Sequence, residues 1–277
     1  MRRREFLRGA TLLPIASSAV ASEAVNPVDY VLSQPGSLPI LLTAPHGGQL
    51  SIPGVGVRNT RDKGKDSDRY NTGRDPETDR IAIGIAKELN RTLGGDPYLV
   101  VARFDRLYID ANRPPDIAFD NPICRPVYER YHGMIRTYVD DLRAKFKAAV
   151  MIDVHGQHKF PGAMVRGTLN GKSVRNLVAR AGFDAVIGPK GMFGLLEKEG
   201  FDVFPSNRLP PTDRHEDGGF NGGFTTMQYG SHRPDGIDAF QFEIGRNYRT
   251  RFEVDRTISR IARAVAAFHE AYLKRPS

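Results

Sequence analysis

The sequence predicts an α/β protein in which a mixed, mostly parallel sheet is covered by helices on both faces. Short apolar runs alternate along the chain with longer segments of helical periodicity, which is the pattern of strand–helix–strand units. The apolar runs are continuous rather than alternating, as in strands that are buried on both faces. The length of 277 residues suits one large domain or two small ones, and we expect one domain over residues 22–277.

Five elements are expected in the first half of the chain. The strands are continuous apolar runs, and the helices carry apolar residues every three or four positions. A polar, glycine-rich region without periodicity predicts a long loop, of the kind that is often functional. In order, we expect a strand at 38–48, the loop at 51–76, a helix at 77–93, a strand at 98–104 and a helix at 125–148.

The second half continues the alternation. Its apolar runs predict strands at 149–154 and 237–245, with candidate strands at 163–169 and 185–187. Helical patterns, two short and one long and amphipathic, lie between and after these strands. The helices are expected at 173–181, 192–199 and 254–273, and a second long loop at 205–223.

The first 21 residues have the layout of an export signal. A basic start leads into a mildly apolar stretch that ends in small residues, with cleavage expected after Ala21. The pair Arg3-Arg4, followed after one residue by Phe6 and Leu7, resembles the twin-arginine signal. We therefore expect the twin-arginine export machinery to be a partner and the mature protein to be periplasmic or exported.

The same segment is not expected to be a stable membrane anchor. Its apolar run is interrupted by Pro14, Ser17 and Ser18 and falls short of the roughly 20 residues that span a bilayer. Without the signal, the formal charge of +8 drops to +5, and the bases are spread along the chain. That distribution predicts no nucleic-acid partner and at most a preference for small anionic substrates.

Polar, metal-binding side chains follow the ends of the predicted strands. His46, Asp110 and His155 each lie at or just past such an end, where ligands bind in parallel sheets. Both histidines are followed by glycine. Two imidazoles and a carboxylate with an open position form a typical catalytic zinc site, so we expect the histidines to share a site.

Four motifs together resemble the N-formylglutamate amidohydrolase family. The motifs are TAPHGG, RFDRLYIDANRPP, IDVHGQ and DAFQFEIGRNYR, in the order found in that family and spanning roughly His46 to Arg249. The family is related to zinc carboxypeptidases and to the aspartoacylase/succinylglutamate desuccinylase group. The resemblance implies a phosphorylase/hydrolase-like α/β fold and a metal-dependent amide hydrolase. It departs from the family at Gly47 or Gly48, where serine is more common.

The resemblance implies His46 and His155 as ligands of one Zn²⁺ ion or another divalent metal. The third ligand is harder to place, because Gln49 stands where related carboxypeptidases have a carboxylate. We assign Asp79 to this role, with Glu77 and Asp75 as competitors. An acid in the first turn of a helix also interacts favourably with the helix dipole, which is the alternative role for Asp79.

The resemblance also implies the residues that act on the substrate. Asn112 and Arg113 match a clamp for a substrate carboxylate, and a guanidinium can grip a carboxylate with two hydrogen bonds. Arg106 matches the residue that stabilises the oxyanion. Glu243 matches the general base, and it shares a strand face with Gln241 because their spacing is two.

Three residues around His155 are given supporting roles. Asp153 lies on the same strand face as His155, where we expect either a hydrogen bond to the ligands of the site or a polar contact in the core. Gly156 is expected to let the backbone turn away where the substrate approaches. His158 is a candidate for a more distant contact, and His132, on the predicted long helix, is expected to be structural.

The function expected from these residues is zinc-dependent hydrolysis of an N-acyl amino acid or a similar small amide that bears a carboxylate. A periplasmic zinc carboxypeptidase or peptidoglycan-peptide amidase is the alternative, because an exported enzyme would meet other substrates. A third interpretation is non-enzymatic: a periplasmic protein that binds small acidic ligands with the same arginines.

Overall fold

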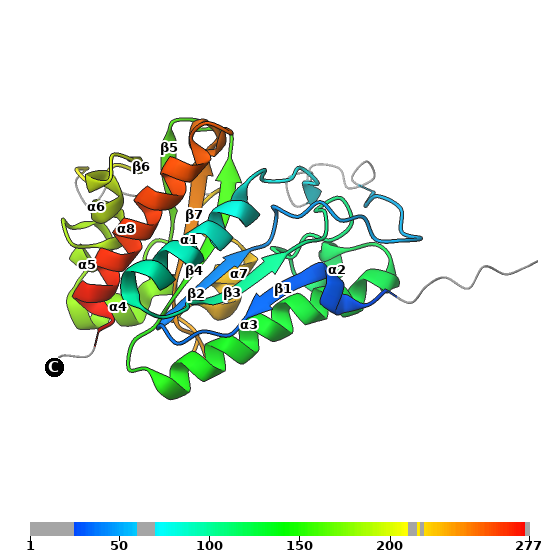
Figure 1. Cartoon of the computed structure of the whole chain (residues 1–277), viewed down its shortest axis with the longest axis horizontal. Helices are drawn as coiled ribbons and strands as arrows, with labels where there is room; N and C mark the ends of the chain where they lie inside the picture. Colours follow the sequence, from blue (N-terminus) through cyan, green and yellow to red (C-terminus); the bar gives the residue numbers. More distant parts are fainter. Residues whose placement is uncertain (1–24, 60–69, 210–214, 217–218, 275–277) are drawn as a thin grey trace, which may run out of the picture.

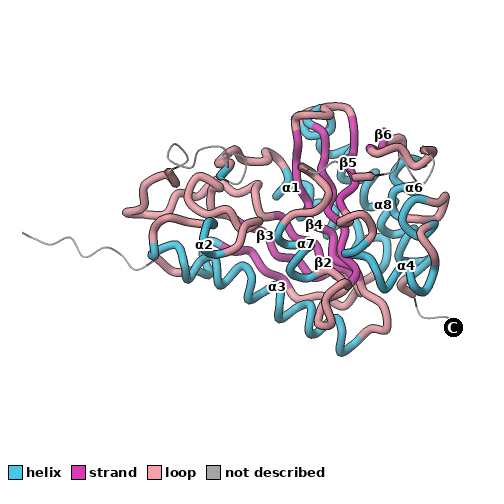
Figure 2. Tube along the Cα trace, turned by 180° about the vertical axis from the view of Figure 1, so that it is seen from behind, coloured by secondary structure: helices cyan, strands magenta, loops and turns pink. Residues whose placement is uncertain are grey.

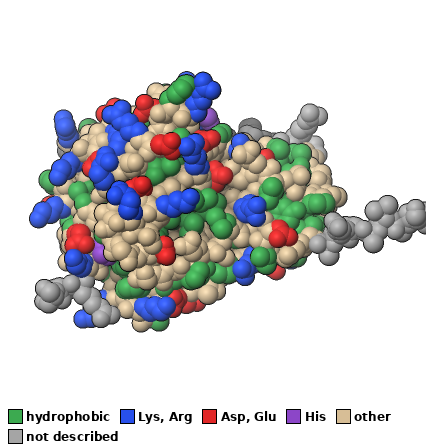
Figure 3. Space-filling model, in the orientation of Figure 1, with side chains coloured by type: hydrophobic (Ala, Val, Ile, Leu, Met, Phe, Trp, Pro, Cys, Tyr) green, Lys and Arg blue, Asp and Glu red, His purple; other side chains and the backbone are tan. Residues whose placement is uncertain are grey.

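The computed structural model describes residues 25–59, 70–209, 215–216 and 219–274. The expected export signal at residues 1–21 lies outside this part of the chain, so export remains a prediction. On the face shown in Figure 3, Lys and Arg side chains are interspersed with Asp and Glu.

Seven strands form one mixed sheet in the order β1-β3-β2-β4-β7-β5-β6. The four neighbours from β3 to β7 run parallel, whereas β1 pairs antiparallel with β3 and β5 pairs antiparallel with β7. The prediction of a mixed, mostly parallel sheet is thus confirmed. The strands are β1 (Val31–Gln34), β2 (Ile40–Ala44), β3 (Tyr98–Ala102), β4 (Val150–Gln157), β5 (Ala163–Gly167), β6 (Asp202–Phe204) and β7 (Asp238–Gly245).

Helices cover both faces of the sheet, and successive strand residues point alternately into the two cores. In β2, Leu42 packs with the core under α1 (Thr78–Leu93) and α8 (Val254–Tyr272). Leu41 points the other way, toward α3 (Arg125–Lys145). Figure 1 shows α1 and α8 in front of the sheet, and Figure 2 shows α3 running along the opposite side.

A search of the described helices for a segment that could span a membrane found none.

Shorter helices complete the two layers. The remaining α-helices are α2 (Pro115–Ala118), α4 (Arg175–Ala181), α5 (Asp184–Ile187), α6 (Met192–Lys198) and α7 (Phe224–Tyr229). The 3₁₀-helices are η1 (Pro27–Tyr30), η3 (Pro122–Cys124), η4 (Lys172–Val174) and η6 (Arg246–Arg249).

The structure corrects one predicted element and adds others. Residues 185–187, expected to be a strand, belong to helix α5, because a three-residue apolar run does not distinguish a buried strand from one turn of a helix. The strand expected at 149–154 continues to Gln157, so His155 lies inside β4. The edge strands β1 and β6 and the helix α7 were not predicted.

Both predicted long loops are confirmed within the described part of the chain, where 51–59, 70–76 and 205–223 contain no α-helix or strand. The parallel strands bring their carboxyl ends to one edge of the sheet beside these loops. In the register of β4 and β7, His155 lies opposite Glu243. His46 follows β2, the other neighbour of β4, by two residues.

Candidate active site

A cavity of about 890 Å³ lies at this edge of the sheet. Its walls come from three segments that are far apart in the sequence: 70–75, 155–159 and the glycine-rich stretch at 219–223. Six of the seven side chains that the sequence assigned to the site line it: His46, Arg106, Asn112, Arg113, His155 and Glu243. Asp79 is the exception.

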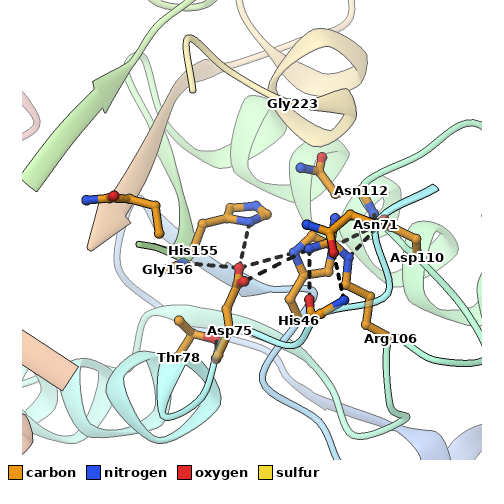
Figure 4. A network of polar contacts seen from close by, with 12 residues as sticks. His46, Asn71, Asp75, Thr78, Arg106, Asp110, Asn112, His155, Gly156 and Gly223 are labelled. Carbon is orange, nitrogen blue, oxygen red and sulfur yellow. Dashed lines mark hydrogen bonds and ion pairs between the residues drawn. The ribbon is translucent and has the colours of Figure 1, made fainter. Parts of the chain in front are cut away.

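Asp75 joins the two histidines at the floor of the cavity. Its Oδ2 atom lies 3.2 Å from Nδ1 of His46 and 3.4 Å from Nδ1 of His155. The three ligand-type atoms all lie within 4.8 Å of one another, and all three side chains are buried (Figure 4). Burial would raise the pKa of Asp75, but the hydrogen bonds with His155 and His46 bring it below its ordinary value.

The backbone brings Asp75 to this position. Its N–H donates to the carbonyl of His46 (3.0 Å), and the N–H of Gly156 donates to its Oδ2 (3.1 Å). The Thr78 hydroxyl donates to its carbonyl at 2.7 Å. Glu77 then adopts a left-handed conformation (φ 72°), uncommon for a residue other than glycine, and starts α1.

Each imidazole is held from behind by a second carboxylate. Nε2 of His46 lies 2.7 Å from Oδ1 of Asp110, and Nε2 of His155 lies 2.8 Å from Oδ2 of Asp153. Both aspartates are fully buried, and the Thr43 hydroxyl donates to Asp153 at 2.5 Å. Each Nε2 thus faces its aspartate and each Nδ1 faces Asp75, so Nδ1 atoms that have lost their protons would be placed to bind a metal ion together with Asp75.

This donor set fits a divalent metal ion. Two imidazole nitrogens and one carboxylate are common ligands of zinc, and several other divalent ions accept the same set. The paired aspartates behind the imidazoles are the usual outer partners of metal-binding histidines, because they fix the tautomer and the ring orientation. The buried Asp75 carboxylate, held between two Nδ1 atoms, supplies the negative charge of such a site.

Asp79, assigned to the third ligand position from the sequence, does not join the two histidines. It lies in the first turn of α1, where a Cβ atom added to Gly47 would come within 2.6 Å of its Cβ. Glu77 pairs with Arg80 at 3.4 Å instead of entering the cavity. Among the three acids left open by the sequence, the structure thus places Asp75 beside the imidazoles.

Glu243 faces the cavity from β7. Its neighbours in the strand, Phe242 and Ile244, point to the other face of the sheet and pack into the core under α1 and α8. Nε2 of Gln241 donates to its Oε1 at 2.6 Å. The N–H of Gly223 donates to the Gln241 side-chain oxygen, which fixes the orientation of the amide. Burial raises the pKa of Glu243 to about 7, although the nearby His155 acts to lower it.

Arg106 lies beside the proposed ligands and is already paired. Its Nε and Nη2 contact Oδ2 of Asp110 at 2.9 and 2.8 Å, and its Nη1 donates to the carbonyl of Gly73. Nη1 also lies 4.0 Å from Oδ1 of Asp75. Burial would lower the pKa of Arg106, but Asp110 and Asp75 raise it above its ordinary value, so the guanidinium stays charged.

Asn112 and Arg113 lie across the cavity. The Asn112 side-chain oxygen accepts hydrogen bonds from the backbone N–H of Thr225 (2.9 Å) and from its hydroxyl (3.2 Å). Its NH2 group is therefore turned to Gly223, where an added Cβ would lie 2.1 Å from Nδ2. Nη1 of Arg113 donates to the Asn112 carbonyl at 2.8 Å. Both residues line the cavity as expected.

The structure also places the four residues to which the sequence gave supporting or structural roles. Asp153 is the hydrogen-bond partner of His155, the first of the two roles expected for it. His158 is exposed on the cavity wall, and His132 is structural, since it lies between the Tyr229 hydroxyl (3.0 Å) and the carbonyl of Ala111 (2.9 Å). Gly156 lines the cavity, but it lies within β4, so the predicted turn of the backbone there was wrong.

Two residues of the site have no role predicted from the sequence. Gln241 is expected only to share a strand face with Glu243. Arg249, which is buried beneath the site, only forms part of the motif DAFQFEIGRNYR. The spacing of two between Gln241 and Glu243 was the available signal for Gln241.

No family model and no curated protein matches this chain. Among solved structures, it resembles N-formylglutamate amidohydrolase from Ralstonia eutropha JMP134, with a TM-score of 0.57 and 17% identity over 87% of this chain and 97% of that one. A gene product of Agrobacterium tumefaciens gives 0.54 and 18% over 87% and 95%. A bacteriophage poly-gamma-glutamate hydrolase gives 0.39 and 16% over 87% and 89%.

The first two structures share the fold, and at these identities the likeness concerns the fold alone. Solved structures that this chain resembles include an N-formylglutamate amidohydrolase, the family that the motifs predict.

Proposed function

We propose that this protein is a metal-dependent hydrolase of a linear amide bond, and that its substrate is an N-acyl amino acid or a similar small amide with a carboxylate. One observation carries the proposal. The ligand-type atoms of His46, Asp75 and His155 meet within 4.8 Å at the floor of a cavity that Glu243 also lines. The fold shared with an N-formylglutamate amidohydrolase is consistent with it.

His46, Asp75 and His155 would hold one Zn²⁺ or another divalent ion. Such an ion supplies Lewis acidity, both to a water molecule and to an amide carbonyl. The protein contributes the geometry, because Asp110 and Asp153 fix the two imidazole rings. The Nδ1 atoms then need no reorientation when the ion enters.

Glu243 is the proton carrier in the proposed reaction. Its Oε1 is occupied by the Gln241 amide, which leaves Oε2 to accept a proton from the attacking water. As the water oxygen bonds to the amide carbon, that proton moves to Glu243, and it then passes to the nitrogen as the C–N bond breaks. The products are a carboxylic acid and an amine, which at neutral pH ionise to a carboxylate and an ammonium ion. A pKa of about 7 suits a group that must both accept and release a proton near neutral pH.

Two arginines have separate roles in the proposed reaction. Arg106 places a permanently charged guanidinium within 4.0 Å of Asp75, where it would stabilise negative charge on the carbonyl oxygen. Arg113 and the NH2 group of Asn112 would bind the substrate carboxylate on the other side of the cavity. With both groups lining one cavity, the site would favour an amide that also bears a carboxylate.

Metal analysis and a substrate panel test the proposal. We expect the purified protein to contain about one divalent ion per chain and to lose hydrolysis of N-acyl amino acids when a chelator removes it. Returning Zn²⁺ should restore the activity. A metal-free protein whose activity is the same in the His46→Ala variant would contradict the proposal.

A longer substrate is the second candidate. The cavity of about 890 Å³ lies toward the upper end of the 300–1,000 Å³ that is typical of small-molecule sites. A cavity of that size would also have room for a peptide, as in a carboxypeptidase or a peptidoglycan-peptide amidase. The same panel should therefore include peptides with a free C-terminus and cell-wall peptides. A higher kcat/KM for these peptides than for N-acyl amino acids would favour the second candidate.

We further propose that the protein is exported through the twin-arginine pathway, on the basis of its first residues. Replacing Arg3 and Arg4 with lysine should retain the protein in the cytoplasm, because that pathway reads the arginine pair. Cell fractionation with the wild type as control checks this. Equal export of both proteins would contradict it.

A further inference from the structure

Arg249 contacts the backbone beside three residues of the proposed site. It lies in η6, directly after β7, and is 6% exposed. Its Nη1 donates to the carbonyl of Pro76 (2.6 Å), its Nε to that of Ile244 (3.0 Å) and its Nη2 to that of Gln157 (3.4 Å). These carbonyls belong to the residue after Asp75, the residue after Glu243 and the second residue after His155.

The three segments meet only through folding. Asp75 lies on a loop, His155 on β4 and Glu243 on β7, so no local hydrogen-bond ladder joins all three. A guanidinium has five N–H donors in a rigid fork and can bridge three carbonyls at once, whereas a lysine ammonium is a point charge on a flexible chain. The contacts of Arg249 thus use a property that only arginine has.

Arg249 is also a buried charge that has only carbonyl partners in the part of the chain that the structure describes. Within the described residues it forms hydrogen bonds to carbonyls and no ion pair. Burial lowers its pKa, while the nearby carboxylates of Asp75 and Glu243 act to raise it. Burying a cation whose partners are carbonyl groups rather than a carboxylate is costly, and its place beneath the site fits a role in positioning the chain.

Gly156 is the residue that makes room for Arg249. A Cβ atom added to Gly156 would lie 2.4 Å from Cζ and 2.6 Å from Nε of Arg249. The guanidinium is held by hydrogen bonds to three carbonyls, so moving it away from a side chain at position 156 would strain or break them. The N–H of Gly156 meanwhile donates to Asp75 (Figure 4). Gly156 therefore contacts both the proposed metal ligand and the arginine behind it.

We propose that Arg249 is a positioning residue that holds Asp75, His155 and Glu243 in their relative places, and that position 156 must be glycine to admit it. The proposal rests on the proposed function for the identity of the site. One prediction is independent of the proposed function. Gly156 and Arg249 should be energetically coupled, because the guanidinium of Arg249 occupies the space that a side chain at position 156 would need.

The test is a double-mutant cycle with Gly156→Ala, Arg249→Ala and both together. We measure urea unfolding and affinity for Co²⁺ or Zn²⁺ by competition with a chromophoric chelator. Each single variant should weaken metal affinity by about 10–100-fold, the range for outer groups that orient ligands. In the Arg249→Ala background, adding Gly156→Ala should change neither unfolding nor metal affinity further, since the space is then vacant.

Arg246→Ala is the matched control, because Arg246 lies in the same turn but is exposed, and it should behave as the wild type. If Arg249→Ala does not fold, Arg249→Lys keeps the charge without the fork and should show an altered visible spectrum of bound Co²⁺. Additive effects in the cycle, or an Arg249→Lys protein with the wild-type spectrum and affinity, would overturn the proposal.

The two proposals fail in different ways. A wild-type protein that binds no metal contradicts the proposed function, yet the coupling between positions 156 and 249 in the unfolding energies still tests Arg249. A wild-type protein that binds metal and hydrolyses amides, but shows no coupling, contradicts the role of Arg249 alone.

Discussion

Asp153 holds the imidazole of His155 through a 2.8 Å contact between Oδ2 and Nε2, and the two residues share one face of β4. This contact turns Nδ1 of His155 toward Asp75. Removing the carboxylate should leave the ring free to rotate and lower the basicity of Nδ1. We expect Asp153→Asn to reduce metal affinity by about 10–100-fold.

Metal competition titrations would measure this effect, with thermal unfolding to check that the variant folds. The asparagine variant keeps the shape of the side chain and can still accept the hydrogen bond from the Thr43 hydroxyl. Wild-type affinity in a folded Asp153→Asn protein would show that the carboxylate does not orient the ligand.

Asp75 and Asp79 provide a matched pair, since the same change can be made four residues apart. Asp75→Asn should weaken metal binding by more than the roughly 10–100-fold expected from an outer carboxylate, because it removes an anionic ligand. Asp79→Asn should leave metal affinity unchanged and cost at most about 1 kcal/mol of stability as a first-turn helix acid. The reverse outcome would restore Asp79 as the ligand.

Arg113 should determine the preference for a substrate carboxylate. Arg113→Met removes hydrogen bonds to a charged group, each worth about 1.5–3 kcal/mol, so kcat/KM should fall about 10–100-fold. The loss should be confined to substrates with a free carboxylate, and the corresponding carboxamides should react equally with both proteins. A uniform loss across both classes would contradict a carboxylate clamp.

Glu243→Gln should separate catalysis from binding. The variant should turn over about 10²–10⁴ times more slowly, which is the usual contribution of a general base, while its metal affinity stays unchanged. Glu129→Gln, an exposed change on α3, is the control. Full turnover in the Glu243→Gln protein would remove Glu243 from the mechanism, and intact ligand binding without any turnover in the wild type would favour a non-enzymatic binder.

The layered fold could be predicted from the sequence because its signals are local. Continuous apolar runs mark β2, β3, β4 and β7, and the helical stripes mark α1, α3 and α8. The edge strands β1 and β6 have four and three residues and lack such runs, and the three apolar residues at 185–187 fit a strand and a helix turn equally well. Short elements are set by their tertiary contacts, which the sequence does not show.

The candidate site could also be predicted only in part. His46 and His155 follow from the strand ends, and Glu243 follows from the family motif; the register that places Glu243 opposite His155 is visible only in the structure. The choice of Asp75 over Asp79 depends on the direction of a loop, set by the bond from its N–H to the His46 carbonyl and by the left-handed turn at Glu77. The role of Gly156 depends on Arg249, which lies 93 positions away in the chain.

His132 should make the protein less stable in acid. Burial lowers its pKa to about 4, whereas in the unfolded chain it has the ordinary value of 6.5. Between these values the unfolded state binds the extra proton, so the stability from the neutral ring is complete above pH 6.5 and falls as the pH drops toward 4. At pH 5 the loss should be about 2 kcal/mol. Urea unfolding at pH 7.5 and pH 5 measures this loss of unfolding free energy. The control is His132→Gln, which retains an N–H donor for the Ala111 carbonyl but does not titrate. Other groups titrate in both proteins, so the difference between their pH dependences isolates His132. Equal pH dependences would show that the ring is not held neutral.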